Sequence, residues 1–317
     1  MPQGPRRHPP LPLAALALLA ACASPAPVKD LPHGMMPRAR PAGLQPPAET
    51  TDARVMTAYY AKVQADLLAQ GLLRTDGGGR DTPYTDRMLA DNFLRIALYD
   101  EYARGNGGFA QHETESRLRR WVAPVHVALR FGDSVPLDRR ATDRARIGSY
   151  LARLAKITGH PIALSDTAPN FFLQIVSEDE RHALGPEIAA ALPDLSASEI
   201  AGITELPPST YCLVYAVSDD ETGVYSRAFA VIRSEHPDLL RLSCLHEEIA
   251  QGLGLANDSP VARPSIFNDD EEFALLTTQD ELMLKMLYDP RLRPGMTVDE
   301  ARPIVKTLAQ ELLGGES

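Results

Sequence analysis

The residues best suited to chemistry lie between positions 244 and 258, in the run Cys-Leu-His-Glu-Glu-Ile-Ala-Gln-Gly-Leu-Gly-Leu-Ala-Asn-Asp. Apolar residues recur there at helical spacing and two glycines follow, so we expect a helix that ends in a glycine turn. Glu247 and Gln251 stand one turn apart on such a helix, and their polar ends converge beside it. Side chains at this spacing can hold a metal ion, and the neighbouring Glu248 is a candidate general base.

The spacing fits the metzincin pattern H-E-x-x-H-x-x-G-x-x-H, in which histidines are the metal ligands and the glutamate is the general base. With Glu247 at the first position, Glu248 takes the place of the base and Gly254 that of the glycine. Glu247, Gln251 and Asn257 then take the places of the three ligands. A register that starts at His246 fails, because alanines stand at the later ligand positions. The stretch therefore resembles the active-site helix of a zincin whose zinc ligands have been exchanged.

Carboxylate and amide oxygens suit Ca²⁺, Mg²⁺ or Mn²⁺ better than zinc. One carboxylate and two amides make a weak site, so we expect no bound cofactor, and zinc least of all. The favoured interpretation is a network of hydrogen bonds among Glu247, Glu248, Gln251 and Asn257 in place of the metal. The alternative is an oxygen-rich metal site with Glu248 as the base. For His246, a half-exposed helix residue is favoured over a ligand or a base.

The first residues are typical of an export signal. Arg6 and Arg7 precede a short apolar run at 11–20, which is too short to span a bilayer. The run leads into Leu-Ala-Ala-Cys, ending at Cys22, which resembles the lipobox of bacterial lipoproteins. That resemblance implies cleavage before Cys22, lipidation of its thiol and a lipid anchor in the bacterial envelope, facing the periplasm and expected at the outer membrane. An ordinary signal peptide with an incidental cysteine is the alternative.

Three cysteines are present. If Cys22 carries a lipid, Cys212 and Cys244 remain as an even pair in an oxidising compartment. Cys212 opens a strand-like run and Cys244 opens the helical motif. A disulfide between them and two buried free thiols are equally compatible with the sequence.

Four segments follow from composition and periodicity. We expect a signal peptide at 1–21, a lipidated and disordered tether at 22–52, a helical annex at 53–118 and a main domain at 119–317. The annex holds helices at 53–73 and 85–102. The main domain is expected to hold a strand at 125–131, a helix at 141–158, strands at 162–164 and 171–176, a mostly helical insert at 186–206, a hairpin of 212–217 with 224–232, the motif helix, a helix capped by Thr277 or Thr278, and a last helix at 298–313.

This order of elements resembles the zincin fold. It indicates the α+β class, with a mixed twisted sheet, an edge hairpin, an active-site-type helix and C-terminal helices. Metzincins carry a methionine turn beneath the metal, and here Ser-Ile-Phe-Asn at 265–268 stands in its place, with Phe267 for the methionine. Together with the lipobox, E-E-x-x-Q-x-L-G-L-x-N-D, S-I-F-N-D and L-Y-D-P-R-L-x-x-G-M, this resembles an uncharacterised family of proteobacterial envelope lipoproteins over about residues 55–305.

The chain is acidic, with a net charge of −10, so nucleic acid is a poor partner. We expect a lipoprotein whose degenerate zincin-like domain binds a protein or peptide or serves as a scaffold, with the membrane reached through the lipid. The alternative is a metal-dependent peptidase or cell-wall hydrolase. Fold resemblance does not decide between them.

Overall fold

The computed structural model describes the backbone of residues 50–105 and 108–314, and the side chains of 50–99 and 114–314. The described residues belong to one compact unit, Pro46–Ser317. At its centre is a five-stranded sheet in the order β4-β3-β5-β7-β6. Its strands are β3 (Val125–Phe131), β4 (Ile162–Leu164), β5 (Phe171–Val176), β6 (Cys212–Ser218) and β7 (Tyr225–Arg233). All pairs are parallel except β6 with β7, which form an antiparallel hairpin at the edge. The α+β class and the edge hairpin are confirmed.

Both faces of the sheet are covered, and the sequence of β7 shows why. Successive side chains of a strand point to opposite faces. Ala228, Ala230 and Ile232 belong to one hydrophobic cluster, and Phe229 and Val231 belong to another. A strand buried on both faces therefore needs an apolar residue at every one of these positions.

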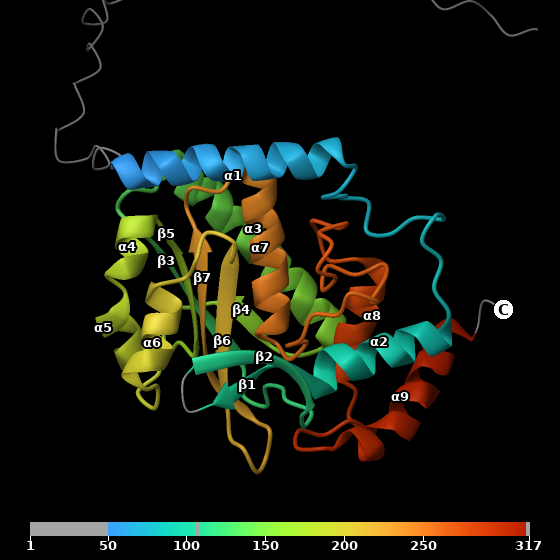
Figure 1. Cartoon of the computed structure of the whole chain (residues 1–317). Coiled ribbons are helices and arrows are strands. Elements are labelled where there is room, and N and C mark those ends of the chain that lie inside the picture. The colour runs from blue at the N-terminus through green and yellow to red at the C-terminus, as the bar shows by residue number, and fades with distance from the viewer. Residues whose placement is uncertain (1–49, 106–107, 315–317) are drawn as a thin grey trace, which may run out of the picture. The chain divides into compact units, whose positions relative to one another are not determined.

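The larger cluster lies beneath α3 (Leu137–Thr158) and α7 (Asp238–Gln251), which cover one face of the sheet (Figure 1). The smaller cluster joins the other face to α5 (Gly185–Ala191) and α6 (Ala197–Thr204), the helices of the insert expected at 186–206. A short helix that was not expected, α4 (Glu178–His182), precedes them. The result is a three-layer arrangement with α7 next to the edge hairpin.

The helix expected at 85–102 is shorter than predicted. α2 (Asp86–Leu98) begins at its cap Thr85 and ends before Tyr99, whose backbone is extended. The chain continues as β1 (Tyr99–Gly105), which pairs with β2 (Gly108–Glu115). The hydrogen bonds between the two strands pair the backbone N–H and C=O groups that a longer helix would have paired within itself. Local periodicity does not reveal this pairing, because it depends on the neighbouring strand.

Residues on the two sides of the boundary expected at residue 119 pack into the same hydrophobic core. Leu89, Phe93 and Ile96 of α2 are fully buried. They belong to the core cluster shared with α8 (Thr278–Leu287) and α9 (Val298–Leu313), the two C-terminal helices. α2 is therefore built into the main core.

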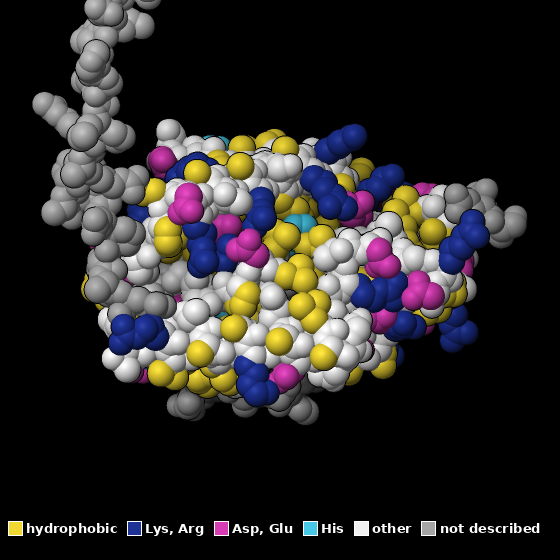
Figure 2. All heavy atoms as spheres, turned by 90° about the horizontal axis from the view of Figure 1, so that it is seen from above, with side chains coloured by type: hydrophobic (Ala, Val, Ile, Leu, Met, Phe, Trp, Pro, Cys, Tyr) yellow, Lys and Arg dark blue, Asp and Glu magenta, His cyan; other side chains and the backbone are white. Residues whose placement is uncertain are grey.

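α1 (Thr51–Ala69) lies across one end of the layers (Figure 1). Its Gln64 accepts a hydrogen bond from the backbone N–H of Leu240, in the first turn of α7, at 3.0 Å. Val55, Tyr59 and Leu68 of α1 are exposed. Seen from above, this side of the molecule carries hydrophobic side chains among basic and acidic ones (Figure 2). Within the described part of the chain, no helix is long and apolar enough to cross a membrane.

Candidate functional site

A disulfide joins the motif helix to the edge strand. Cys244, buried on α7, is bonded to Cys212, the first residue of β6, with their Cα atoms 5.9 Å apart. Of the two alternatives left open by the sequence, the bridge is confirmed. It fixes α7 against the outermost strand, so the residues that follow Cys244 on α7 are held at the sheet edge. Cys22 lies outside the described residues.

Glu248 is the most buried acid of the motif, with 4% of its surface exposed. Its carboxylate accepts the backbone N–H of Val214 on β6, and its Oε2 atom is buried with no hydrogen-bond partner. Burial, and after it the charge of Asp258, raises the pKa of Glu248 well above its usual range. An orphaned carboxylate oxygen in this position is costly unless a proton or a cation joins it.

Glu247 is half-buried and lies in the same acidic surroundings. Burial raises its pKa well above the ordinary value, and the charges of Asp258, Glu248, Glu271 and Asp269 raise it further, in that order. Carboxylate oxygens of Glu247 and Glu248 and the sulfur of Cys212 all lie within 4.8 Å of one another. The two glutamates therefore form a carboxyl pair that holds protons at a pH where exposed glutamates have lost them.

Gln251 and Asp258 are joined across the turn that ends α7. The amide Nε2 of Gln251 donates to Asp258 Oδ1 at 2.9 Å. Gly254 makes this possible, because its φ is +125° and a Cβ there would stand 2.3 Å from the carbonyl oxygen of Arg119. The expected glycine turn is present, and it brings Asp258 back toward Gln251.

Asn257 is directed at α2. Its Nδ2 donates to the carbonyl oxygen of Arg95 at 3.1 Å, and its backbone N–H donates to that of Ile96 at 3.0 Å. Its Oδ1 is buried without a partner. We expected Asn257 to face Gln251, but Asp258 is the residue that bonds Gln251, and the side chain of Asn257 anchors the loop to α2.

His246 is buried, with 8% of its surface exposed, so the half-exposed interpretation is wrong. Its ring stacks on Tyr150 with centroids 4.0 Å apart, and its Nδ1 accepts the backbone N–H of Leu276 at 3.2 Å. Burial, and then the charge of Arg153, lowers the pKa of His246 to about 3. The neutral ring is thus a packing residue between α3, α7 and the start of α8.

Hydrogen bonds to α8 hold the turn at 265–268 in place. Asp280 of α8 accepts hydrogen bonds from Ser265 Oγ at 2.6 Å and from the backbone N–H of Ile266 at 3.0 Å. Phe267 is fully buried, and its carbonyl accepts the backbone N–H of Ser259 at 2.8 Å. Phe267 therefore fills the core beneath the loop that carries Asn257 and Asp258.

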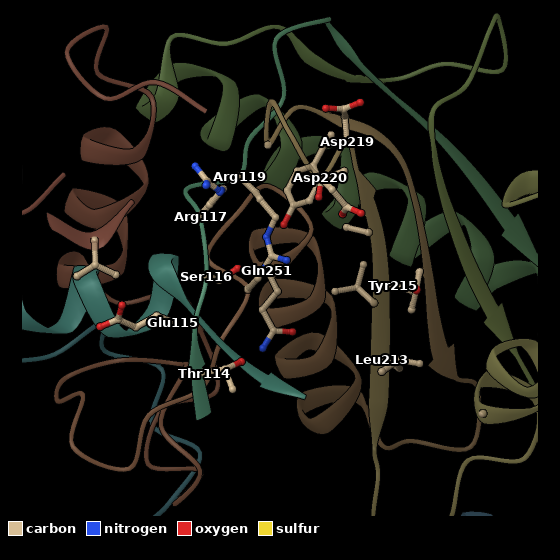
Figure 3. A pocket seen from close by; sticks show the side chains of 18 of the residues that line it. Thr114, Glu115, Ser116, Arg117, Arg119, Leu213, Tyr215, Asp219, Asp220 and Gln251 are labelled. Atoms are coloured by element: carbon tan, nitrogen blue, oxygen red, sulfur yellow. The ribbon is translucent and has the colours of Figure 1, made fainter. Parts of the chain in front are cut away.

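A cleft of about 810 Å³ runs along the outer edge of β6 (Figure 3). Leu213, Val214, Tyr215 and Ala216 of β6 form one wall. The segment 114–119 forms the opposite wall, and its charged members are Glu115, Arg117 and Arg119. Gln251, at the end of α7, lies between the two walls, and Asp219 and Asp220 lie on the hairpin turn at one end (Figure 3).

Several site residues escaped the sequence reasoning. Asp258 directly follows the expected ligand position Asn257, and the metzincin pattern assigns it no role. Burial, and after it the charges of Asp270 and Asp269, raises the pKa of Glu271 to about 7. Its backbone has φ +57°, and its carbonyl accepts the Leu73 N–H. The wall at 114–119 had no signal at all, because it lies more than a hundred residues before the motif.

The fold and the site together define an α+β protein with a mixed five-stranded sheet, a cleft at the sheet edge, and a pair of glutamates of which the buried one, Glu248, contacts the edge strand. The chain belongs to the DUF2927 family, described as a protein of unknown function, whose model matches residues 86–307. No curated protein matches the chain. No solved structure matches it either.

Proposed function

We propose that the protein is a lipid-anchored protein of the bacterial envelope, on the periplasmic side of the outer membrane, whose zincin-like domain binds an extended peptide segment of a partner without cutting it. The observation that carries this proposal is the cleft along the edge of β6. The lipid anchor rests on the sequence around Cys22 and on the disulfide, which is typical of an oxidising compartment.

β6 has hydrogen-bonding capacity on the side away from β7. β6 is the edge strand, with β7 on one side only. The backbone N–H of Val214 interacts with the carboxylate of Glu248 on α7, and we infer from this that the backbone groups of Val214 point outward. Residues two apart in an antiparallel strand point the same way, so the N–H and C=O of Ala216 also face outward. Ala216 lines the cleft. An extended peptide that enters the cleft would add a strand to β6 through the N–H and C=O of Ala216.

The cleft also offers side-chain selectivity. Leu213 and Tyr215 provide apolar surface on the β6 wall, while Arg117 and Arg119 stand on the opposite wall. Asp219 and Asp220 lie at the hairpin end. This distribution favours an extended segment with apolar side chains at alternate positions and charges that match the two regions.

The zincin-like interpretation is supported by the place of the motif in the fold. The β6–β7 hairpin leads directly into α7, and Glu248, at the position of the zincin general base, contacts the edge strand. A peptide on β6 would therefore pass the end of Glu248, as a substrate passes the base of an active zincin.

The second candidate is a metal-dependent peptidase or cell-wall hydrolase with Glu248 as the base, and the close approach of the Glu247 and Glu248 carboxylates favours it. Two ligand positions weigh against it. The amide N–H of Gln251 is bonded to Asp258, and the side chain of Asn257 is bonded to the backbone of α2, so the two amides are directed at different partners and do not share one site. Binding without catalysis accounts for these contacts more directly.

The test is a selection of peptides from a random decapeptide library on the full chain, followed by affinity measurements with variants. Ala216→Pro removes the outward N–H. Proline at this edge position leaves the hydrogen bonds between β6 and β7 in place, because the lost N–H faces away from β7. We expect at least a tenfold loss of affinity with Ala216→Pro and less than a twofold change with Ala216→Val, which keeps the N–H. Ala256→Arg, which places a long side chain in the cleft lining, should also weaken binding.

Thermal unfolding of each variant shows whether it is folded. Selected peptides that bind Ala216→Pro and Ala256→Arg as tightly as the wild type would overturn the proposal. Mass spectrometry of the library peptides after incubation with the protein tests the second candidate, because it detects cleavage. Cleavage that a chelator stops and Glu248→Gln abolishes would establish the hydrolase in place of the binding protein.

A further inference from the structure

The group formed by Cys212, Glu247 and Glu248 is the strongest unassigned cluster in the described part of the chain, and it is blocked by the disulfide. One ligand atom of each residue lies within 4.8 Å of the other two. In the oxidised protein the sulfur of Cys212 is bonded to Cys244 and is not available as a thiolate. Only carboxylate oxygens are then offered to a cation.

A histidine stands on the other side of the bridge. His236 Nδ1 lies 3.7 Å from the sulfur of Cys244, and the ring is fully buried between Tyr60 and Tyr211. Its Nε2 is buried without a hydrogen-bond partner. The disulfide is thus flanked by a carboxyl pair at Cys212 and by an imidazole at Cys244.

The unpartnered Oε2 of Glu248 is a second, independent sign of a ligand. Glu248 is more than nine-tenths buried, one side of its carboxylate is used by Val214, and the other has no partner. The acids around it, Asp258 above all, add negative charge to the same place. The cluster has the charge and the open ligand atoms that a divalent cation would satisfy.

We propose that reduction of the Cys212–Cys244 disulfide creates a binding site for a thiophilic divalent metal ion, Zn²⁺ by its chemistry, with Cys212, Glu247 and Glu248 as ligands. The site differs from the degenerate zincin site, because it uses the sulfur of Cys212 and needs neither Gln251 nor Asn257. A thiolate with two carboxylates falls within the ligand set of zinc, whereas carboxylates alone do not select it. This inference goes beyond peptide binding and does not depend on it.

The chemical step balances with a dithiol reductant. Two electrons and two protons pass from the dithiol to the S–S bond, which breaks to give the thiols of Cys212 and Cys244, and the reductant becomes a disulfide. The thiol proton of Cys212 goes to solvent when the metal binds, as do protons held by the carboxyl pair. The thiol of Cys244 stays beside His236, whose Nδ1 is placed to accept its S–H.

The test measures the zinc retained by the full chain after gel filtration. The oxidised wild type is compared with wild type reduced by a phosphine under argon, and with Cys244→Ser and Cys212→Ser. Both variants lack the bridge, but only Cys244→Ser leaves a free sulfur at Cys212. We expect about one zinc per chain for the reduced wild type and for Cys244→Ser, and at least a tenfold lower amount for the oxidised wild type and Cys212→Ser.

Cobalt supplies the spectroscopic signature, since a thiolate–Co²⁺ charge-transfer band should appear in the reduced wild type and in Cys244→Ser and be absent in Cys212→Ser. Glu248→Gln should weaken zinc binding at least tenfold, and the exposed control Glu221→Gln less than twofold. Equal zinc in Cys212→Ser and Cys244→Ser, or no zinc in the reduced wild type, would overturn the proposal. If a serine variant fails to fold, the comparison of zinc in the reduced and the oxidised wild type still tests the proposal.

Discussion

The amide of Gln251 donates a 2.9 Å hydrogen bond to the carboxylate of Asp258, seven residues further along the chain. This contact closes the turn after α7 and places a negative charge next to the Glu247–Glu248 pair. Gln251, which ends α7 and lines the cleft, is therefore linked through Asp258 to the charges that surround Glu247 and Glu248.

Stability should fall as pH rises through the range where the carboxyl pair differs from the unfolded chain. The folded protein keeps protons on Glu247 and Glu248 that the unfolded chain loses above its ordinary pKa of 4.5. Unfolding therefore releases protons and is favoured at higher pH. Glu248→Gln, which has no proton to lose, should flatten the profile between pH 5 and pH 8 relative to the wild type.

Urea unfolding at several pH values measures this effect. Glu221→Gln, an exposed substitution on the β6–β7 turn, is the control and should run parallel to the wild type. A Glu248→Gln profile that is also parallel to the wild type would show that Glu248 does not hold a proton in the folded protein.

Asp280→Ala should destabilise the protein by about 3 kcal/mol. Asp280 accepts hydrogen bonds from Ser265, Ile266 and both the N–H and hydroxyl of Thr277, and all of these groups are buried. Removal of the acceptor leaves several buried donors unpaired, each at a cost of about 1–3 kcal/mol before relaxation. Chemical unfolding measures the loss, and Asp138→Ala, at the exposed start of α3, should change stability by no more than about 0.5 kcal/mol. Similar losses in the two variants would contradict the role of Asp280 as the tie between turn and helix.

Gly254→Ala should cost more than Gly159→Ala. Both glycines have positive φ, +125° and +67°, but only at Gly254 would a Cβ meet backbone, at 2.3 Å from the Arg119 carbonyl oxygen. Gly159 has open space, so its substitution carries only the left-handed strain of about 1–2 kcal/mol. We expect Gly254→Ala to lose at least about 3 kcal/mol or to fail to fold, because the backbone must shift. Equal melting temperatures would show that the turn adapts freely.

Cys22→Ser should prevent cleavage and lipidation at this position. If the lipobox is used, the serine variant keeps its signal segment or leaves the membrane fraction, whereas Ser24→Ala behaves as the wild type. Cell fractionation and the apparent mass of the product measure this. A Cys22→Ser protein of mature size in the membrane fraction would refute lipidation.

Much of the architecture follows from the sequence, because it depends on local periodicity. The alternation in 125–131, the helical spacing of 141–158 and the strand–turn–strand pattern ending at 232 all reappear in the structure within a few residues. Thr277, one of the two expected candidates, caps α8. Its hydroxyl and the carboxylate of Asp280, three residues later, form a capping box. The i and i+4 spacing likewise placed Glu247 and Gln251 on one side of α7.

The tertiary structure decided what depends on contacts between distant segments. The pairing of β1 with β2 ended α2 at Leu98, and the packing of α2 drew Asn257 toward Arg95 and away from Gln251. The choice between bridge and free thiols needed the distance between β6 and α7. The raised pKa of Glu248 comes from burial, which no residue type reveals alone, because the same side chain on an exposed helix face would ionise normally.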